Sequence, residues 1–176
     1  LTVLLGLFRV ESGGTVNSSG GGITGEQIQF NADVGGANFQ IDAGATATIE
    51  DFVLGANASN LHYFTGGGTL SITDDILIGA DDATLTNDIT TAVAVTDRIQ
   101  FSSGTNNSSF INNGTITAST LFFFDDDNFF TNASTATFSG NLTTNGGGDD
   151  DNTITNNSSS TLNFVNLDAN GADLTV

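Results

Sequence analysis

The segment LFFFDDDNFF, residues 121–130, sets phenylalanines directly against consecutive aspartates. Such a sequence is tolerated where the rings are buried while the carboxylates stay hydrated. Alternation along a β-strand meets both needs, because Leu121 and Phe123 then point to one side and Phe122 and Phe124 to the other. The aspartates would form the corner at which the chain leaves the sheet. We expect Phe129 to point inward from the next strand.

The same apolar pair recurs along the chain with a nearly fixed period. The first members of successive pairs are 23, 24, 24, 23 and 22 residues apart in the series Leu5/Leu7, Ile28/Phe30, Phe52/Leu54, Ile76/Ile78, Ile99/Phe101 and Leu121/Phe123, which Leu142 and Phe164 continue. A second column has the same period and contains Leu1, Ile23, Ala47, Leu70, Val93, Ile116, Phe138 and Leu162. A third is looser and contains Val16, Phe39, Leu61, Leu85, Phe110, Phe129, Ile154 and Leu174.

These apolar columns with a common period predict a coil of short strands. We expect an all-β fold, a parallel β-solenoid (β-helix) with about 23 residues per rung, three short strands per turn and uncapped ends. Inward phenylalanines should stack on the rungs above and below them. We also expect residues 1–176 to form a single solenoid segment that is part of a longer repetitive chain or fibre.

The charge of the chain excludes several classes of partner. Arg9 and Arg98 are the only basic residues apart from His62, against 20 acidic residues, and the net charge is -18. Nucleic acids and anionic lipids are bound by clustered lysine or arginine, so we expect neither as a partner. The sequence contains no cysteine for disulfides or thiol chemistry, and no apolar run long enough to predict a membrane span.

Two groups of acidic residues are candidate calcium ligands. Glu26, Glu50, Asp74 and Asp97 each precede an inward pair by two positions, and Asp125, Asp126 and Asp127 form a corner. Carboxylates stacked on successive rungs repel one another, which raises their pKa values or attracts a cation. Hard oxygen ligands suit calcium, the one cofactor that the sequence suggests. The alternative interpretation is a solvated acidic surface without specific sites.

Small hydroxyl residues flank the second apolar column. Their outward positions are expected to be Gly22/Thr24, Thr46/Thr48, Thr69/Ser71, Ala92/Ala94, Thr115/Thr117, Thr137/Ser139 and Thr161/Asn163. Threonine is common at outward β positions for packing reasons alone. The strip nevertheless resembles the T-x-T arrays of ice-binding solenoids, and a flat strip would also suit packing against another copy.

Outward apolar rings and the hydroxyl strip together predict self-association. We expect an interface that includes Phe122, Phe124, Thr46, Thr48, Thr115 and Thr117, and therefore a homo-oligomer or fibre. Asparagine-rich corners such as NNG (112–114) and TNNSSS (155–160) predict amide ladders between rungs.

No set of catalytic residues is evident. His62 is the single histidine and lies next to Tyr63, without an orienting partner in the sequence pattern, so we expect a packing or surface role. Catalytic solenoids need converging acids and bases, whereas a continuous ladder of carboxylates is a feature of the repeat. We therefore expect no enzymatic activity.

Three segments carry a resemblance to a known group: NNGTITAST (112–120), TATFSGNLTTNGG (135–147) and NNSSSTLNFVN (156–166). They are similar to the repeat regions of large secreted β-helical adhesins of Bacteroidota and, more distantly, of filamentous-haemagglutinin-like surface proteins. The resemblance implies a structural, secreted segment of a cell-surface fibre or adhesin stalk. Binding, for example to cell-surface glycans, would then reside in regions outside this sequence. The alternative is an ice-binding or ligand-binding solenoid that uses the threonine-rich face.

Overall fold

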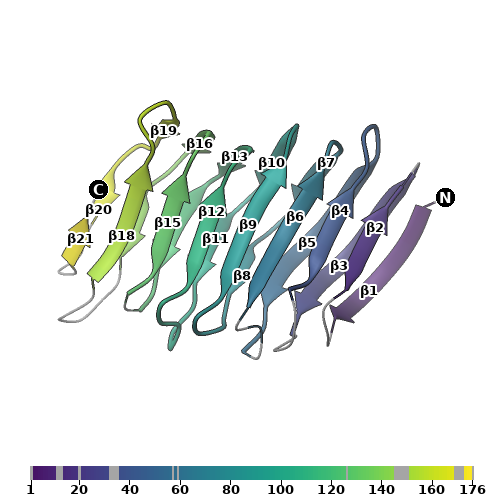
Figure 1. Cartoon of the computed structure of the whole chain (residues 1–176), viewed down its shortest axis with the longest axis horizontal. Coiled ribbons are helices and arrows are strands. Elements are labelled where there is room, and N and C mark those ends of the chain that lie inside the picture. The colour runs from purple at the N-terminus through teal and green to yellow at the C-terminus, as the bar shows by residue number, and fades with distance from the viewer. Residues whose placement is uncertain are drawn as a thin grey trace.

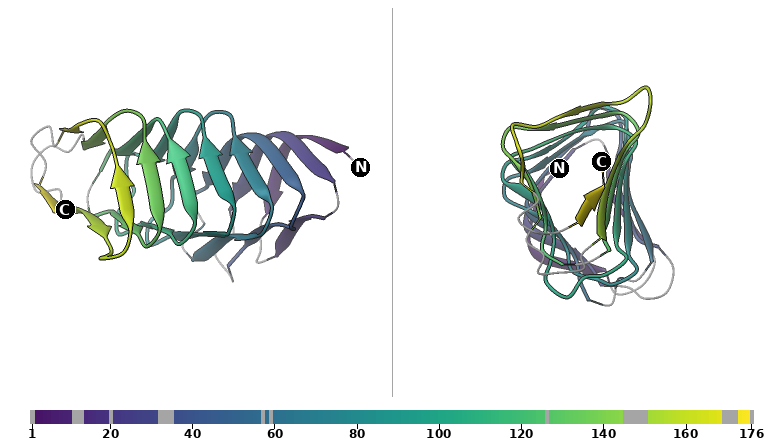
Figure 2. Two further views of the ribbon diagram at one scale, coloured as in Figure 1. Left: turned by 90° about the horizontal axis from the view of Figure 1, so that it is seen from above. Right: turned by 90° about the vertical axis from the view of Figure 1, so that its left-hand side faces the viewer.

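The computed structural model describes residues 2–10, 14–19, 21–31, 36–56, 58, 60–125, 127–144, 151–168 and 173–175. Over these residues the chain forms a parallel β-solenoid without helices, with about 23 residues per rung. Figure 1 shows its strands side by side in one long array, and Figure 2 shows that successive turns surround a common core. The predicted fold class is confirmed.

Two parallel sheets form the walls of the coil. The larger sheet has 13 strands: β1 (Thr2–Val10), β3 (Gly22–Phe30), β5 (Thr46–Leu54), β7 (Thr69–Ile72), β8 (Ile76–Ile78), β10 (Ala92–Val95), β11 (Arg98–Phe101), β13 (Thr115–Ala118), β14 (Thr120–Phe123), β16 (Thr135–Phe138), β17 (Leu142–Thr144), β19 (Thr161–Asn163) and β20 (Leu167–Asp168). The smaller sheet has eight strands: β2 (Thr15–Ser18), β4 (Asn38–Ile41), β6 (Leu61–Gly66), β9 (Thr84–Ile89), β12 (Ser109–Asn112), β15 (Phe129–Asn132), β18 (Asp151–Asn156) and β21 (Asp173–Thr175).

The number of strands per turn changes along the coil. The first strands of the larger sheet, β1, β3 and β5, are each nine residues long, and β5 pairs with both β7 and β8. The chain has one residue more between Ile72 and Ile76 than between their partners Ile49 and Phe52. This extra residue breaks the long strand into two short ones. Three strands per turn are therefore present from β7 onward, whereas the earlier turns have two.

The first apolar column forms the centre of the core. Its members pair in the order Ile28, Phe52, Ile76, Ile99, Leu121 and Leu142, and all are buried. Phe101 and Phe123 stack with ring centroids 4.9 Å apart and an interplanar angle of 9°, as the rung spacing predicts. Other neighbouring rings meet edge to face, both between the two sheets, as for Phe52 and Phe64, and between turns of one sheet, as for Phe39 and Phe64.

At its ends, the predicted first column is wrong in register. Phe8, not Leu5, pairs with Ile28, and Leu7 is 54% exposed. At the other end Leu142 pairs with Leu167, while Phe164 follows β19 and packs half-buried on the core. Both errors arose because several apolar residues lie within two or three positions of one another, so spacing alone did not choose between them.

In the second column, the prediction for Phe138 is wrong by two residues. Ile116 pairs with Ala136, and Phe138 pairs with Ala118, one inward position further along the same strands. Both inward residues of β16 are buried. Leu1 lies outside the described residues.

The third column differs most from the prediction. Phe129 is 37% exposed and Phe130 is buried in its place, because the preceding Asn128 already occupies an inward position. Likewise Leu61 is 53% exposed, and the buried His62 pairs with Leu85. Polar residues occupy inward positions in this column. A prediction that considers apolar residues alone therefore placed the neighbouring residues, Phe129 and Leu61, in the interior instead.

Buried asparagines form a hydrogen-bonded ladder along the smaller sheet. The amide nitrogen of Asn87 donates to Asn112, that of Asn112 to Asn132, and that of Asn132 to Asn156, each at 2.8 Å. Asn87, Asn112 and Asn132 are fully buried. Each amide thus supplies a partner that the next one needs in the interior. The predicted amide ladder is confirmed at Asn112 and Asn156.

Candidate functional site

Three carboxyl groups gather between the strands of the larger sheet. Asp74 and Asp75 lie between β7 and β8, and Asp97 lies one turn later, between β10 and β11. One carboxylate oxygen of each lies within 4.8 Å of those of the other two. Asp74 and Asp97 are exposed, whereas Asp75 is buried. This arrangement could hold a cation at the surface of the coil.

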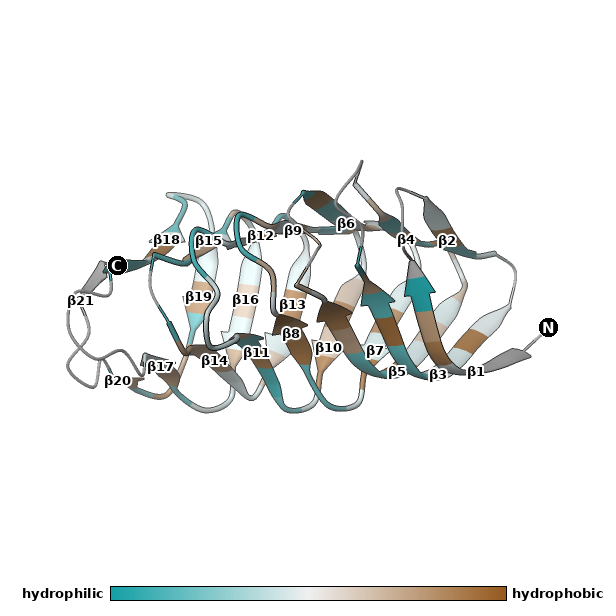
Figure 3. Ribbon diagram, turned by 90° about the horizontal axis from the view of Figure 1, so that it is seen from below, coloured by the Kyte–Doolittle hydropathy of each residue, from teal (hydrophilic) through white to brown (hydrophobic). Residues whose placement is uncertain are grey.

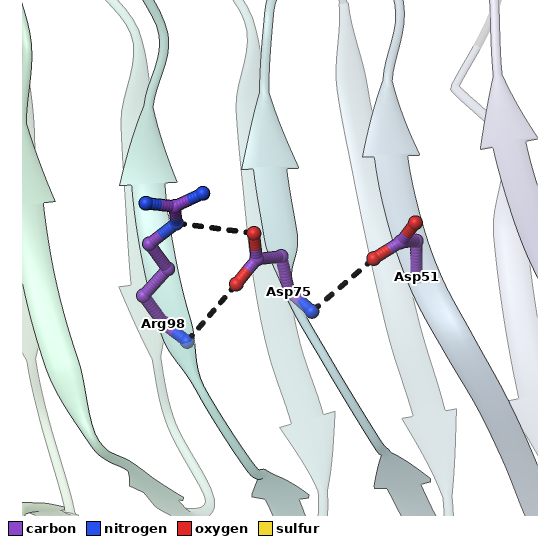
Figure 4. A network of polar contacts seen from close by, with 3 residues as sticks. All are labelled: Asp51, Asp75 and Arg98. Atoms are coloured by element: carbon purple, nitrogen blue, oxygen red, sulfur yellow. Dashed lines mark hydrogen bonds and ion pairs between the residues drawn. The ribbon is translucent and has the colours of Figure 1, made fainter.

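Asp75 is also the centre of a polar network (Figure 4). Its Oδ2 accepts a hydrogen bond from Nε of Arg98 at 3.0 Å, and its Oδ1 accepts one from the backbone N–H of Arg98 at 3.2 Å. The backbone N–H of Asp75 in turn donates to Oδ1 of Asp51 at 3.3 Å. The side chain of Asp75 is 8% exposed. Burial raises the pKa of Asp75, an effect that Arg98 opposes and Asp74 reinforces.

Arg98 limits what the cluster can bind. Calcium takes about six to eight oxygen ligands. Arg98 already donates to both carboxylate oxygens of Asp75, so a cation would be held chiefly by Asp74 and Asp97. The donor set therefore fits exposed, weak cation binding. A tightly held calcium would have to displace Arg98 from Asp75.

The structure brings together only part of the predicted acidic ladder. Glu26 and Glu50 are exposed residues of the long strands β3 and β5 and lie outside the cluster. Asp75 was missed, although its position was visible in the sequence. Asp51, Asp75 and Arg98 immediately precede the inward residues Phe52, Ile76 and Ile99, so they form a column of their own.

The second predicted acidic group lies on the corner after β14. Oδ2 of Asp125 accepts a hydrogen bond from the backbone N–H of Gly104 at 2.6 Å, which ties this corner to the one before it. Asp127 is exposed, and its φ of 52° matches those of Asp82 (54°) and Asn107 (55°) in the preceding corners. Aspartate and asparagine tolerate this left-handed conformation better than most residues, which explains their recurrence here. Asp126 lies outside the described residues.

Phe122 and Phe124 point outward, as predicted. Phe122 pairs with Gln100 and Thr143, and Phe124 is 39% exposed just after β14. Their ring centroids are 5.8 Å apart at an interplanar angle of 62°. The aspartate corner therefore begins directly beside a pair of surface rings.

The hydroxyl strip covers the outer face of β5, β7, β13, β16 and β19. Thr46 pairs with Thr69 and Thr48 with Ser71, while Ala92 and Ala94 interrupt the array. Figure 3 shows β13, β16 and β19 mostly pale, which marks a face of intermediate hydropathy crossed by apolar inward residues.

One pair of the strip was misplaced. Thr115 and Thr117 pair with Thr135 and Thr137, whereas Ser139 follows β16 in a turn. This shift follows from the wrong inward position given to Phe138. The corrected array is more regular than the predicted one. A shallow groove of about 290 Å³ runs over this end of the strip, lined by Thr117, Thr137, Ser119 and Ser139 among others.

His62 is a structural residue inside the coil. Its Nδ1 accepts a hydrogen bond from the backbone N–H of Ala37 at 3.2 Å, and its Nε2 lies 3.0 Å from the carbonyl oxygen of Ala58. These partners require the neutral tautomer with the proton on Nε2. Burial lowers the pKa of His62 below its ordinary value, although the hydrogen bond to Ala58 opposes this. Both ring nitrogens are thus engaged in holding the corner together.

Comparisons of the chain with protein-family models, curated proteins and solved structures found no match. Among the described residues there is no helix of the length and apolar character needed to cross a membrane.

Proposed function

We propose that this chain is a structural, non-catalytic segment of an extracellular bacterial fibre or adhesin stalk. The observation that carries the proposal is the continuous axial core. Inward side chains pair from turn to turn in both sheets, and the interior is filled by apolar residues and by the asparagine ladder. Such a coil can lengthen by adding turns, and each turn is stabilised by its neighbours.

Such a stalk would lie outside the cell. The similarity of the repeats to secreted β-helical adhesins supports this location, and the high net negative charge is consistent with solubility there. Recognition of cell-surface glycans would be the task of regions outside this sequence.

Lateral self-association would convert single coils into a fibre. The hydroxyl strip is the surface best suited to it, because Thr46, Thr69, Thr115 and Thr135 form an uncharged row on a chain of net charge -18. Uncharged side chains allow two copies to approach with less repulsion than elsewhere on the surface.

Negative-stain electron microscopy and sedimentation velocity test this function. The proposal predicts rods or bundles for the wild type at physiological ionic strength, and dispersal by Thr117→Glu, which places a charge on the strip. Thr155→Glu is the matched control, since Thr155 is an exposed residue of β18 in the other sheet and should leave bundling unchanged. Compact, monodisperse particles of the wild type under all salt conditions would contradict the proposal.

A second candidate function is ice or ligand binding by the same strip. The corrected register favours this function, because Thr115 and Thr117 lie side by side with Thr135 and Thr137 on neighbouring strands and so form a regular T-x-T array. Thermal hysteresis separates the two functions. Ice binding predicts activity that Thr115→Tyr abolishes and Thr131→Tyr, a half-buried outward position on β15, preserves. A stalk segment should show no hysteresis in any variant.

A further inference from the structure

The surface next to the acidic corner combines aromatic rings with carboxylates. Phe122 and Phe124 contact each other on the outside of the coil, and the neighbours of Phe122 in the sheet, Gln100 and Thr143, are polar. Phe124 remains 39% exposed. Aromatic rings that stay accessible beside polar neighbours are typical of interaction surfaces.

Carboxylates continue directly from these rings. Asp125 follows Phe124 and is fixed by the backbone N–H of Gly104 at 2.6 Å, and Asp127 is exposed. Asp81 and Asp82 lie on the same edge in an earlier corner, which is joined to the following one by hydrogen bonds to Asn106. The edge therefore presents carboxylates in two corners, separated by one uncharged corner (residues 102–107), and the aromatic pair lies next to the second of them.

We propose that Phe122, Phe124 and the acidic corner of Asp125 and Asp127 form a docking surface for a polypeptide segment with exposed lysine or arginine. The long side chains of these residues match both parts of the surface. Their aliphatic stems can cover the rings while the cationic group reaches the carboxylates. A cation over an aromatic face adds a further attraction. This inference does not depend on the proposed stalk function.

Charge argues against a second copy as the occupant. Each copy carries a net charge of -18 and has only Arg9 and Arg98 as permanent cations. Arg98 pairs with Asp75, and Arg9 donates to Gln29. A second copy would therefore bring further negative charge to the acidic corner. Both of its arginines already have partners within its own fold. The interface predicted for Phe122 and Phe124 thus fits a cationic partner better than a homotypic one.

Fluorescence anisotropy with a labelled oligolysine tests the surface at physiological ionic strength. Phe122→Ala/Phe124→Ala should weaken binding about tenfold without changing net charge. Leu61→Ala is the control, since Leu61 is an exposed apolar residue of the other sheet and should leave affinity unchanged. Circular dichroism checks the fold. Phe124→Ala alone, an exposed position after β14, provides a milder variant with the same expected direction.

The charge component has its own matched pair. Asp127→Asn should weaken binding more than Glu26→Gln, because both remove one exposed carboxylate but Glu26 lies on β3, four turns away from the rings on β14. Asparagine also tolerates the left-handed backbone of position 127. Unchanged affinity in the ring variants would assign oligolysine binding to diffuse attraction and overturn the proposal. Loss of self-association in the ring variants, with oligolysine binding intact, would assign the rings to a second copy and overturn it as well.

Discussion

Asn112 occupies the middle of the buried asparagine ladder and is the position where a small change should have the largest effect. Its Oδ1 accepts from Asn87, and its Nδ2 donates to Oδ1 of Asn132 at 2.8 Å and to the carbonyl oxygen of Thr135 at 3.1 Å. Asn112→Ala removes all of these bonds at once. The amide nitrogen of Asn87 then loses its acceptor, and Asn132 loses a donor, inside the core.

The magnitude follows from the number of groups left without a partner. A buried polar group that loses its hydrogen bond costs about 1–3 kcal/mol. Asn87 and Asn132 are both fully buried, so we expect Asn112→Ala to lower the free energy of unfolding by about 3–5 kcal/mol. Asn113→Ala is the control. Asn113 is exposed and donates to Asp88 at the surface, so its loss should cost less than about 1 kcal/mol.

Urea unfolding followed by far-ultraviolet circular dichroism measures both variants. Asn112→Ala should be the less stable of the two variants by several kilocalories per mole, because only this substitution leaves buried amides without partners. Equal losses for Asn112→Ala and Asn113→Ala would mean that the ladder contributes no more than a surface contact, and would refute the reasoning.

Three further predictions concern the buried His62, the acidic cluster at Asp74 and the close backbone approach at Gly114. His62 has a pKa below 6.5 in the folded state, so the free energy of unfolding should be highest above pH 6.5 and fall as the pH is lowered through that value; His62→Gln should flatten this part of the pH profile. Calcium should raise the melting temperature more than sodium at equal ionic strength if the acidic cluster binds it, and Asp74→Asn should remove the difference; identical responses to both salts would indicate a solvated surface only. Gly114→Ala should cost about 1–3 kcal/mol in urea unfolding, because its Cβ would clash with the carbonyl oxygen of Ile89, whereas Gly6→Ala should be tolerated; equal stability of the two variants would exclude the clash.

The repeat period carried most of the information about the fold. The inward residues from Ile28 to Leu142 recur on one register because each must lie over the same position of the preceding turn. The outward orientation of Phe122 and Phe124 then followed from alternation. These features are local or strictly periodic, so a single sequence is sufficient to predict them.

Polar residues in the interior could not be placed by the same means. His62 and Asn128 occupy inward positions that an apolar pattern does not predict, because their burial depends on partners a turn away: Ala37 for His62 and Ser108 for Asn128. Asp75 was missed for a related reason. Its position directly before the inward Ile76 can be read from the sequence, but its burial and its ion pair depend on Arg98, one turn away.

The most direct test of the stalk proposal is electron diffraction, or the power spectrum of cryo-electron micrographs, from oriented assemblies of the protein. Strands that run across a solenoid repeat along its axis at a spacing of ~4.8 Å. The proposal predicts rods or bundles with this spacing parallel to their long axis. Assemblies in which the ~4.8 Å spacing is perpendicular to the long axis, or a protein that remains as isolated compact particles, would contradict it.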